Sequence, residues 1–197
     1  METGLAFGAS ALVFVHYHAT EGKSGKHYAI DPNQLTRYRG AALGAVKDAG
    51  LDNHFEWRNG PSHLQIPKLI EAKLSLDCAF IDGWHTFDYT LVDFFLIDKL
   101  LKVGGLVAFH DMYGPAKQKV LRFVLSHRDY EIATEHRVRG GETAIKTLKF
   151  FSWRTLRSPS LLFSGYHWRF QLQNSSGLLV LQKRSQFEPD FDYYKDF

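Results

Sequence analysis

Carboxylates and histidines follow two apolar runs of this sequence, at the points where those runs end. Asp82 and His85 follow the first run, and His110 and Asp111 follow the second. If both runs are parallel strands, their carboxyl ends meet at one sheet edge, and we expect the four side chains to converge there. Carboxylate oxygens suit a hard cation such as Mg²⁺, whereas an imidazole ligand from His110 favours Mn²⁺, Zn²⁺ or Fe²⁺. His85 can take a proton near neutral pH, so the residues predict acid–base chemistry with or without a metal.

A structural interpretation competes at two of these positions. His110 could be a hydrogen-bonded core histidine, and Asp111 could simply cap the helix that follows it.

A glycine-containing turn precedes the first expected helix. Gly4 and Gly8 allow the backbone to approach a ligand closely, and the following helix offers free N–H groups to an anionic group. Asp31 ends the second expected strand, 23 residues after Gly8, where an acid can bind the two hydroxyls of a ribose. Trp84 offers a flat face on which a purine could stack. A plain turn at Gly4–Gly8 and a helix-capping Asp31 are the structural alternatives.

Short apolar runs alternate with stretches of helical periodicity, which predicts an α/β fold with a mostly parallel sheet. The expected strands are residues 28–30, 55–57, 78–81, 106–109 and 178–181. The expected helices are residues 11–17, 38–49, 64–72, 87–101 and 120–125. We expect Gly104 and Gly105 to end the fourth helix.

Composition predicts one domain, residues 1–197, with a basic and aromatic insertion at about 143–176. The hydrophobic share of 45% is ample for a core, and the net charge of +3 gives no support for a nucleic-acid partner. The single cysteine, Cys78, excludes an internal disulfide and is expected to be buried. No apolar run is long enough for a membrane span or resembles a signal peptide, so we expect a cytoplasmic protein.

Taken in order, these motifs resemble the class I S-adenosylmethionine-dependent methyltransferases. The similarity is closest to the small O-methyltransferase-like group with an Ile-Asp-Gly-x-His motif, here residues 81–85, and a Gly-Gly-x-x-x-x-His-Asp motif, here 104–111. The resemblance implies a Rossmann-like, mostly parallel sheet of seven strands with helices on both faces. It also implies S-adenosylmethionine as the methyl donor and O-methylation of a hydroxylated small molecule or sugar.

The resemblance also implies roles for individual residues. His85 would be the catalytic base, and Asp82 and Asp111 would hold Mg²⁺ or another divalent cation. The donor-binding residues implied by position are Glu2, Gly4, Gly8, Ser10, Asp31, Gly60, Ser62, Asp82 and Trp84.

Two features depart from the family pattern. Many metal-dependent relatives carry an acidic or amide ligand beside the second aspartate, where this chain has Met112, a poor ligand for a hard cation. The first strand would lie before Gly4 and is almost wholly missing, so we expect a truncated first strand and a chain shortened at its N-terminus. A nicotinamide-dependent oxidoreductase is an alternative, although Gly-x-x-x-Gly differs from its Gly-x-Gly-x-x-Gly. A non-catalytic protein that retains the fold is another.

Overall fold

A seven-stranded sheet forms the centre of the protein in a computed structural model, which describes residues 1–22, 24–137 and 175–197. The strand order is β3-β2-β1-β4-β5-β7-β6, and all strands except β7 run in one direction. This is the predicted Rossmann-like fold. The strands are β1 (Glu2–Thr3), β2 (His27–Ile30), β3 (Phe55–Arg58), β4 (Leu76–Ile81), β5 (Leu101–Phe109), β6 (Tyr130–Arg137) and β7 (Ser175–Lys183).

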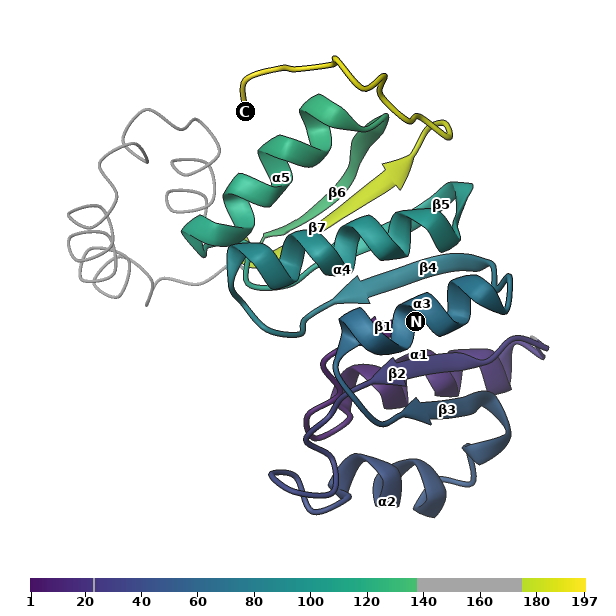
Figure 1. The fold of residues 1–197 in the computed structure, drawn as a ribbon. Coiled ribbons are helices and arrows are strands. Elements are labelled where there is room, and N and C mark those ends of the chain that lie inside the picture. Colours follow the sequence, from purple (N-terminus) through teal and green to yellow (C-terminus); the bar gives the residue numbers. More distant parts are fainter. Residues whose placement is uncertain (23, 138–174) are drawn as a thin grey trace.

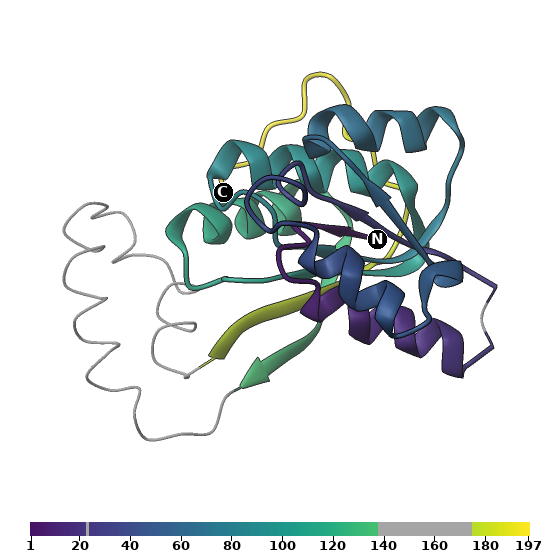
Figure 2. The ribbon, with the colours of Figure 1, turned by 90° about the horizontal axis from the view of Figure 1, so that it is seen from below.

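Helices cover both faces of the sheet, as predicted. Figures 1 and 2 show α3, α4 and α5 on one face and α1 and α2 on the other. The helices are α1 (Ala9–Thr20), α2 (Ala41–Asp48), α3 (Ser62–Glu71), α4 (Phe87–Leu100) and α5 (Pro115–His127), with a 3₁₀ turn, η1, at Asp52–His54. No helix in the described part of the chain is long and apolar enough to cross a membrane.

The central strand β1 is only two residues long, which confirms the expectation of a short first strand. It pairs in parallel with β2 on one side and β4 on the other. Further backbone bonds hold this position: Phe80 N–H donates to the Met1 carbonyl at 2.8 Å, and Asp82 N–H donates to the Thr3 carbonyl at 3.0 Å. The strand therefore still places Gly4 at the carboxyl edge of the sheet.

The prediction that Gly104 and Gly105 end the fourth helix is wrong. α4 ends at Leu100, β5 begins at Leu101, and both glycines lie inside this strand. The pairing with β4 shifts register here, because Leu76 opposes Leu101 whereas Cys78 opposes Leu106. The glycines therefore mark a β-bulge, which is a common use of glycine within a strand.

Cys78 is exposed, so the expectation of a buried thiol is also wrong. It shares one face of β4 with Phe80, which contacts Phe14 of α1 at a ring-centroid distance of 6.2 Å. Both described helices on this face follow the first two strands and lie over that half of the sheet, so the β4 surface at Cys78 stays open. The apolar run at β4 signals burial on only one of its two faces.

The strand β6 was not predicted from the sequence, and the predicted insertion cannot be described. Residues Glu131, Glu135 and Arg137 interrupt any apolar run in β6, and its pairing with β7 places it at the edge of the sheet.

The predicted insertion at 143–176 falls almost wholly within residues 138–174, which lie outside the described residues.

A buried ion pair joins α4 to the last strand. The Lys183 ammonium lies 3.0 Å from Asp98 Oδ1 and donates to the carbonyls of Asp98 and Leu101 at 2.6 and 3.1 Å. The Tyr130 hydroxyl donates to Asp98 at 2.6 Å, and burial together with this bond raises the pKa of that hydroxyl. Lys183 and Asp98 are both 1% exposed, so the loss of Lys183 would leave the buried Asp98 carboxylate with the more distant Arg128, whose Nε lies 3.7 Å away, as its cationic partner.

Replacement of this buried lysine is predicted to destabilise the fold. Lys183→Met should lower the free energy of unfolding by about 3–5 kcal/mol, because Asp98 loses its ammonium partner. Lys102→Met is the matched control: Lys102 lies in β5 and pairs with Asp77 at 2.7 Å on the exposed surface, so its loss should cost less than about 1 kcal/mol. Urea unfolding curves of both variants measure the difference, and equal losses would contradict the prediction.

Candidate functional site

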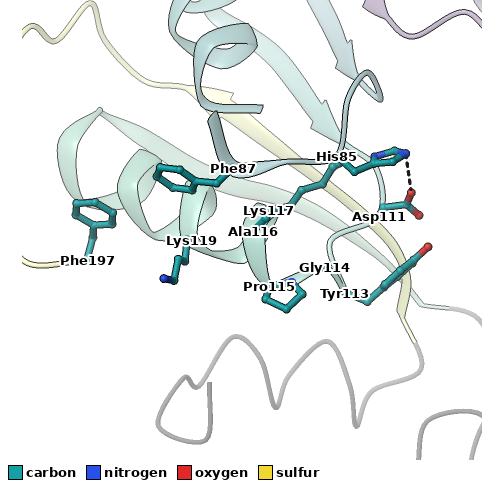
Figure 3. A pocket seen from close by; sticks show the side chains of 10 residues that line it. All are labelled: His85, Phe87, Asp111, Tyr113, Gly114, Pro115, Ala116, Lys117, Lys119 and Phe197. Atoms are coloured by element: carbon teal, nitrogen blue, oxygen red, sulfur yellow. Dashed lines mark ion pairs between the residues drawn. The ribbon is translucent and has the colours of Figure 1, made fainter. Parts of the chain in front are cut away.

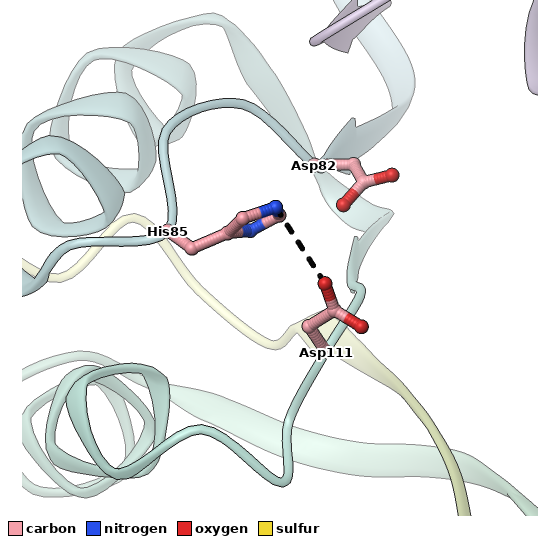
Figure 4. A group of neighbouring side chains, drawn as sticks. All are labelled: Asp82, His85 and Asp111. Atoms are coloured by element: carbon pink, nitrogen blue, oxygen red, sulfur yellow. Dashed lines mark ion pairs between the residues drawn. The ribbon is translucent and has the colours of Figure 1, made fainter. Parts of the chain in front are cut away.

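Asp82, His85 and Asp111 converge at the carboxyl ends of β4 and β5, where the sequence predicted them. One ligand atom from each side chain lies within 4.8 Å of the others. His85 Nε2 lies 3.6 Å from Asp111 Oδ2, and Figure 4 shows its ring pointing toward the space between the two carboxylates. Two carboxylates and one imidazole at these separations are a donor set that fits a divalent cation.

His110 lies between the same two carboxylates. Its Nδ1 is 3.2 Å from Asp82 Oδ1 and 3.4 Å from Asp111 Oδ1. His110 is therefore a member of the cluster, and its ring is half-buried beside Phe80 at 6.0 Å between centroids. The interpretation of His110 as a core histidine describes only part of its environment, because its two carboxylate partners, Asp82 and Asp111, belong to the site.

The pKa values of His85 and His110 are shifted in opposite directions. The hydrogen bond with Asp82 is the main cause that raises the pKa of His110. Burial, followed by the nearby charge of Lys117, lowers the pKa of His85. His85 is thereby kept neutral at pH 7, which is the state that a general base requires.

The backbone at Asp111 is strained. Its φ of +56° lies in the left-handed region, which a non-glycine residue adopts at a cost. The next residue holds this turn in place, because Met112 is fully buried and its N–H donates to the Gly177 carbonyl at 2.7 Å. Met112 is thus a core residue that fixes the direction of Asp111, and its side chain is not available to a cation.

The glycine loop lies directly against the end of β4 at Asp82. Gly4 has a φ of +84°, and a Cβ added there would lie 2.2 Å from the backbone oxygen of Asp82. Gly8 caps α1 without a side-chain hydrogen bond, so the first N–H groups of this helix are available to an anionic group. A glycine loop of this kind fits an anionic group of a ligand.

Asp31 ends β2 as predicted, but its carboxylate already has partners. It accepts hydrogen bonds from the N–H groups of Leu5, Ala6 and Asn33 at 3.0, 2.9 and 2.6 Å. The side chain is 4% exposed. In this conformation Asp31 therefore fastens the glycine loop to the end of β2.

Glu2 and Ser10 interact with each other below the loop. The Ser10 hydroxyl donates to the Glu2 carboxylate, which also pairs with His27 Nε2 at 2.9 Å. Glu2 is fully buried. Both residues thus support the loop from inside the protein.

The remaining predicted donor residues lie at the ends of β3 and β4. Gly60 precedes α3, and Ser62 begins this helix and hydrogen bonds with the buried carboxyl of Asp93, whose pKa is raised by burial. Trp84 is 60% exposed and lies beside Tyr89 at 6.3 Å between ring centroids. The tryptophan face is therefore accessible to a ligand at this edge.

A pocket of about 900 Å³ opens next to the carboxylates (Figure 3). Its lining comes from the ends of β4 and β5, the first turns of α4 and α5, and the C-terminal segment. The residues are His85, Phe87, Asp111, Tyr113, Gly114, Pro115, Ala116, Lys117, Lys119 and Phe197.

Sequence reasoning missed both lysines of this pocket, Lys117 and Lys119, and of these Lys117 is the buried one. It lies one helical turn before Val120 and Leu121 and so on the apolar face of α5, where it is 1% exposed. A lysine on an apolar helix face was the available signal, because buried ammonium groups need specific partners.

Comparison with protein families decides the class of the protein. Residues 1–112, more than half of the chain, match the family described as "Methyltransferase domain". The chain belongs to this methyltransferase family. That membership favours methyl transfer over the nicotinamide-dependent alternative. A search of curated proteins gives no significant match.

Solved structures show the same fold at low sequence identity. The O-methyltransferase TomG from Streptomyces achromogenes, in complex with SAM, is 16% identical with a TM-score of 0.63, over 93% of this chain and 72% of that one. The TDP-rhamnose 3'-O-methyltransferase CalS11 of calicheamicin biosynthesis is 20% identical with a TM-score of 0.55. That match covers 68% of this chain and 65%, less than two thirds, of CalS11. An rRNA methylase from Streptococcus thermophilus is 16% identical with a TM-score of 0.60, covering 93% and 85% of the two chains.

The two histidines are predicted to titrate on opposite sides of the ordinary imidazole pKa of about 6.5. NMR titration of metal-free protein should show His85 below this value and His110 above it, with His85→Gln and His110→Gln variants assigning the signals. Because the pKa of His110 is raised, its stabilising contribution is fully present below about pH 6.5 and is lost as the pH rises through the folded pKa. The reverse order of the two histidines would contradict the assigned environments.

Alanine at Gly4 is predicted to disrupt the junction of loop and strand. Gly4→Ala places Cβ against the Asp82 backbone oxygen and should lower stability well beyond the cost of positive φ alone, which is about 1–2 kcal/mol. Gly50→Ala is the control, because Gly50 has a similar φ of +68° with nothing within 4 Å. Thermal unfolding measures the loss of stability in both variants, and binding of S-adenosylhomocysteine reports on the glycine loop. Equal losses of stability in the two variants would contradict the need for close approach of Gly4 to Asp82.

Proposed function

We propose that this protein is an S-adenosylmethionine-dependent O-methyltransferase that acts on a hydroxylated small molecule or sugar. The observation that carries the proposal is the contact between Gly4 and the Asp82 backbone. It joins the glycine loop to a cluster of two carboxylates and a neutral imidazole in a chain of the methyltransferase family. A methyl donor on the loop would thus lie next to groups that can prepare an oxygen nucleophile.

S-adenosylmethionine supplies a methyl group on a sulfonium, and the chain's residues would orient it. We assign its amino-acid end to the loop of Gly4 and Gly8, supported from inside by Glu2 and Ser10. Asp31 would bind the ribose, which requires the N–H groups of Leu5 and Ala6 to release part of its carboxylate. The adenine would lie near Gly60, Ser62 and Trp84, with Asp82 closing the donor site beside Gly4.

His85 would act as the general base on the acceptor hydroxyl. Its Nε2 takes the hydroxyl proton, the acceptor oxygen forms a bond to the methyl carbon, and the carbon–sulfur bond breaks. Alignment of the reacting atoms is the main contribution of such a site and is worth up to about 7–11 kcal/mol. The lowered pKa of His85 supports this role, because its proton-accepting form is present at pH 7.

Asp82 and Asp111 would hold a divalent cation where the enzyme uses one, and His85, which lies beside them, would stay free to act as the base. A bound cation lowers the pKa of a coordinated hydroxyl. Met112 adds no ligand, so among the described residues the side-chain donors at this edge are the two carboxylates and the nearby imidazoles.

The pocket beside His85 supports a small acceptor. Its volume of about 900 Å³ lies in the range typical of small-molecule sites, about 300–1,000 Å³. Phe87, Tyr113 and Phe197 give it apolar walls, which suit the face of a sugar or phenol ring. The O-methyltransferases CalS11 and TomG share the fold.

Calorimetric titration with S-adenosylhomocysteine tests donor binding, and methyl transfer to a panel of catechols and nucleotide sugars tests the reaction. Folded protein should bind the product, and His85→Gln should lower methyl transfer by at least about 100-fold while donor binding is unchanged. Folded protein that gives no heat would overturn the proposal. Binding without transfer to any acceptor of the panel would favour the non-catalytic alternative.

A further inference from the structure

A buried ammonium group ties together the two strand ends that carry the carboxylates. Lys117 Nζ donates to the His110 carbonyl at 2.8 Å and lies 4.0 Å from Asp82 Oδ1. The carbonyl that it holds directly precedes Asp111, the residue with a strained φ of +56°. One side chain from α5 therefore contacts both the end of β4 and the end of β5.

The position of Lys117 matters for the charge balance of the site. Asp82 lies near the Lys117 ammonium and the His110 imidazole, and Asp111 lies near the imidazoles of His85 and His110. The ammonium is almost completely removed from solvent, so water screens its charge poorly. A divalent cation that binds the carboxylate pair must enter beside this fixed positive charge.

We infer that Lys117 is the internal counter-ion of the Asp82–Asp111 pair. It keeps the two carboxylates assembled in the absence of a cation, and its charge competes with a divalent cation for them. Lys117 is a positioning residue, since it acts through Asp82 and the His110 carbonyl. The inference rests on the proposed function only in taking this pair as the acceptor side of the site.

The affinity for Mn²⁺ alone, measured by electron paramagnetic resonance titration of free Mn²⁺, tests the inference. Lys117→Gln removes the charge and retains an amide donor, and it should tighten Mn²⁺ binding by about tenfold or more. Lys117→Arg keeps the charge and should leave the affinity within about threefold of the parent protein. Lys119→Gln is the matched control, because Lys119 lines the same pocket on the same helix but is exposed, so its effect should stay below about threefold.

Unchanged or weaker Mn²⁺ binding in Lys117→Gln would overturn the inference, as would an equal effect of Lys119→Gln. Binding of S-adenosylhomocysteine, measured on the same samples, reports on the proposed function separately. Lys117→Met provides a second neutral variant.

The parent protein gives a further test that needs no substitution. Its melting temperature should differ by less than about 2 °C between EDTA and millimolar Mn²⁺, because a weakly bound ion stabilises little. A rise of more than about 2 °C would overturn the inference.

Discussion

The close approach of the Gly4 backbone to the Asp82 backbone is the constraint on which the proposed site depends. Two short connections leave the sheet at neighbouring strands, and only a residue without Cβ allows them to meet. Because the glycine loop continues from Gly4 and the acidic cluster begins at Asp82, this one contact sets the distance between the two halves of the site. Neither half can shift along its strand without breaking the parallel pairing of β1 with β4.

This constraint also shows why a two-residue central strand is sufficient. Glu2 and Thr3 each pair with both neighbouring strands, and the Gly4 N–H extends the ladder by donating to the Ile30 carbonyl. The Glu2 carboxylate is held by Ser10 and His27, and the Asp31 carboxylate accepts hydrogen bonds from the N–H groups of Leu5 and Ala6 in the loop. The position of the loop thus depends on side-chain anchors on two sides more than on strand length. In the proposed function the same anchors would oppose donor binding at Asp31, since its carboxylate would have to exchange backbone partners for ribose hydroxyls.

The sequence was informative where chemistry follows directly from strand order. Convergence of Asp82, His85 and Asp111 could be predicted, because parallel neighbours end at one edge of a sheet. For Lys117 the sequence shows only a lysine on an apolar helix face, and its contacts at the site could not be predicted because they depend on which strand ends lie beneath that helix. β6 was missed since its charged residues break the apolar pattern that marks a strand, and the bulge at Gly104 and Gly105 resembled a helix end because glycine serves both purposes. Cys78 was misjudged since an apolar run does not show which face of a sheet lacks a helix.

The same fold occurs in O-methyltransferases and in an rRNA methylase, so the acceptor must be selected by local groups. Near the pocket these groups are of two kinds. Aromatic walls from Phe87, Tyr113 and Phe197 come from three separate segments and set the shape that an acceptor must match. The charges of Asp82, Asp111, His110 and Lys117 cancel when His110 is protonated, so a hydroxyl bound there in the proposed reaction would meet little net charge. The oxyanion that forms would be repelled less than beside two uncompensated carboxylates, whereas the charge of Lys117 lowers the pKa of His85 and makes it a weaker base. In the proposed mechanism the buried lysine would therefore favour formation of the oxyanion at some cost in the strength of the base.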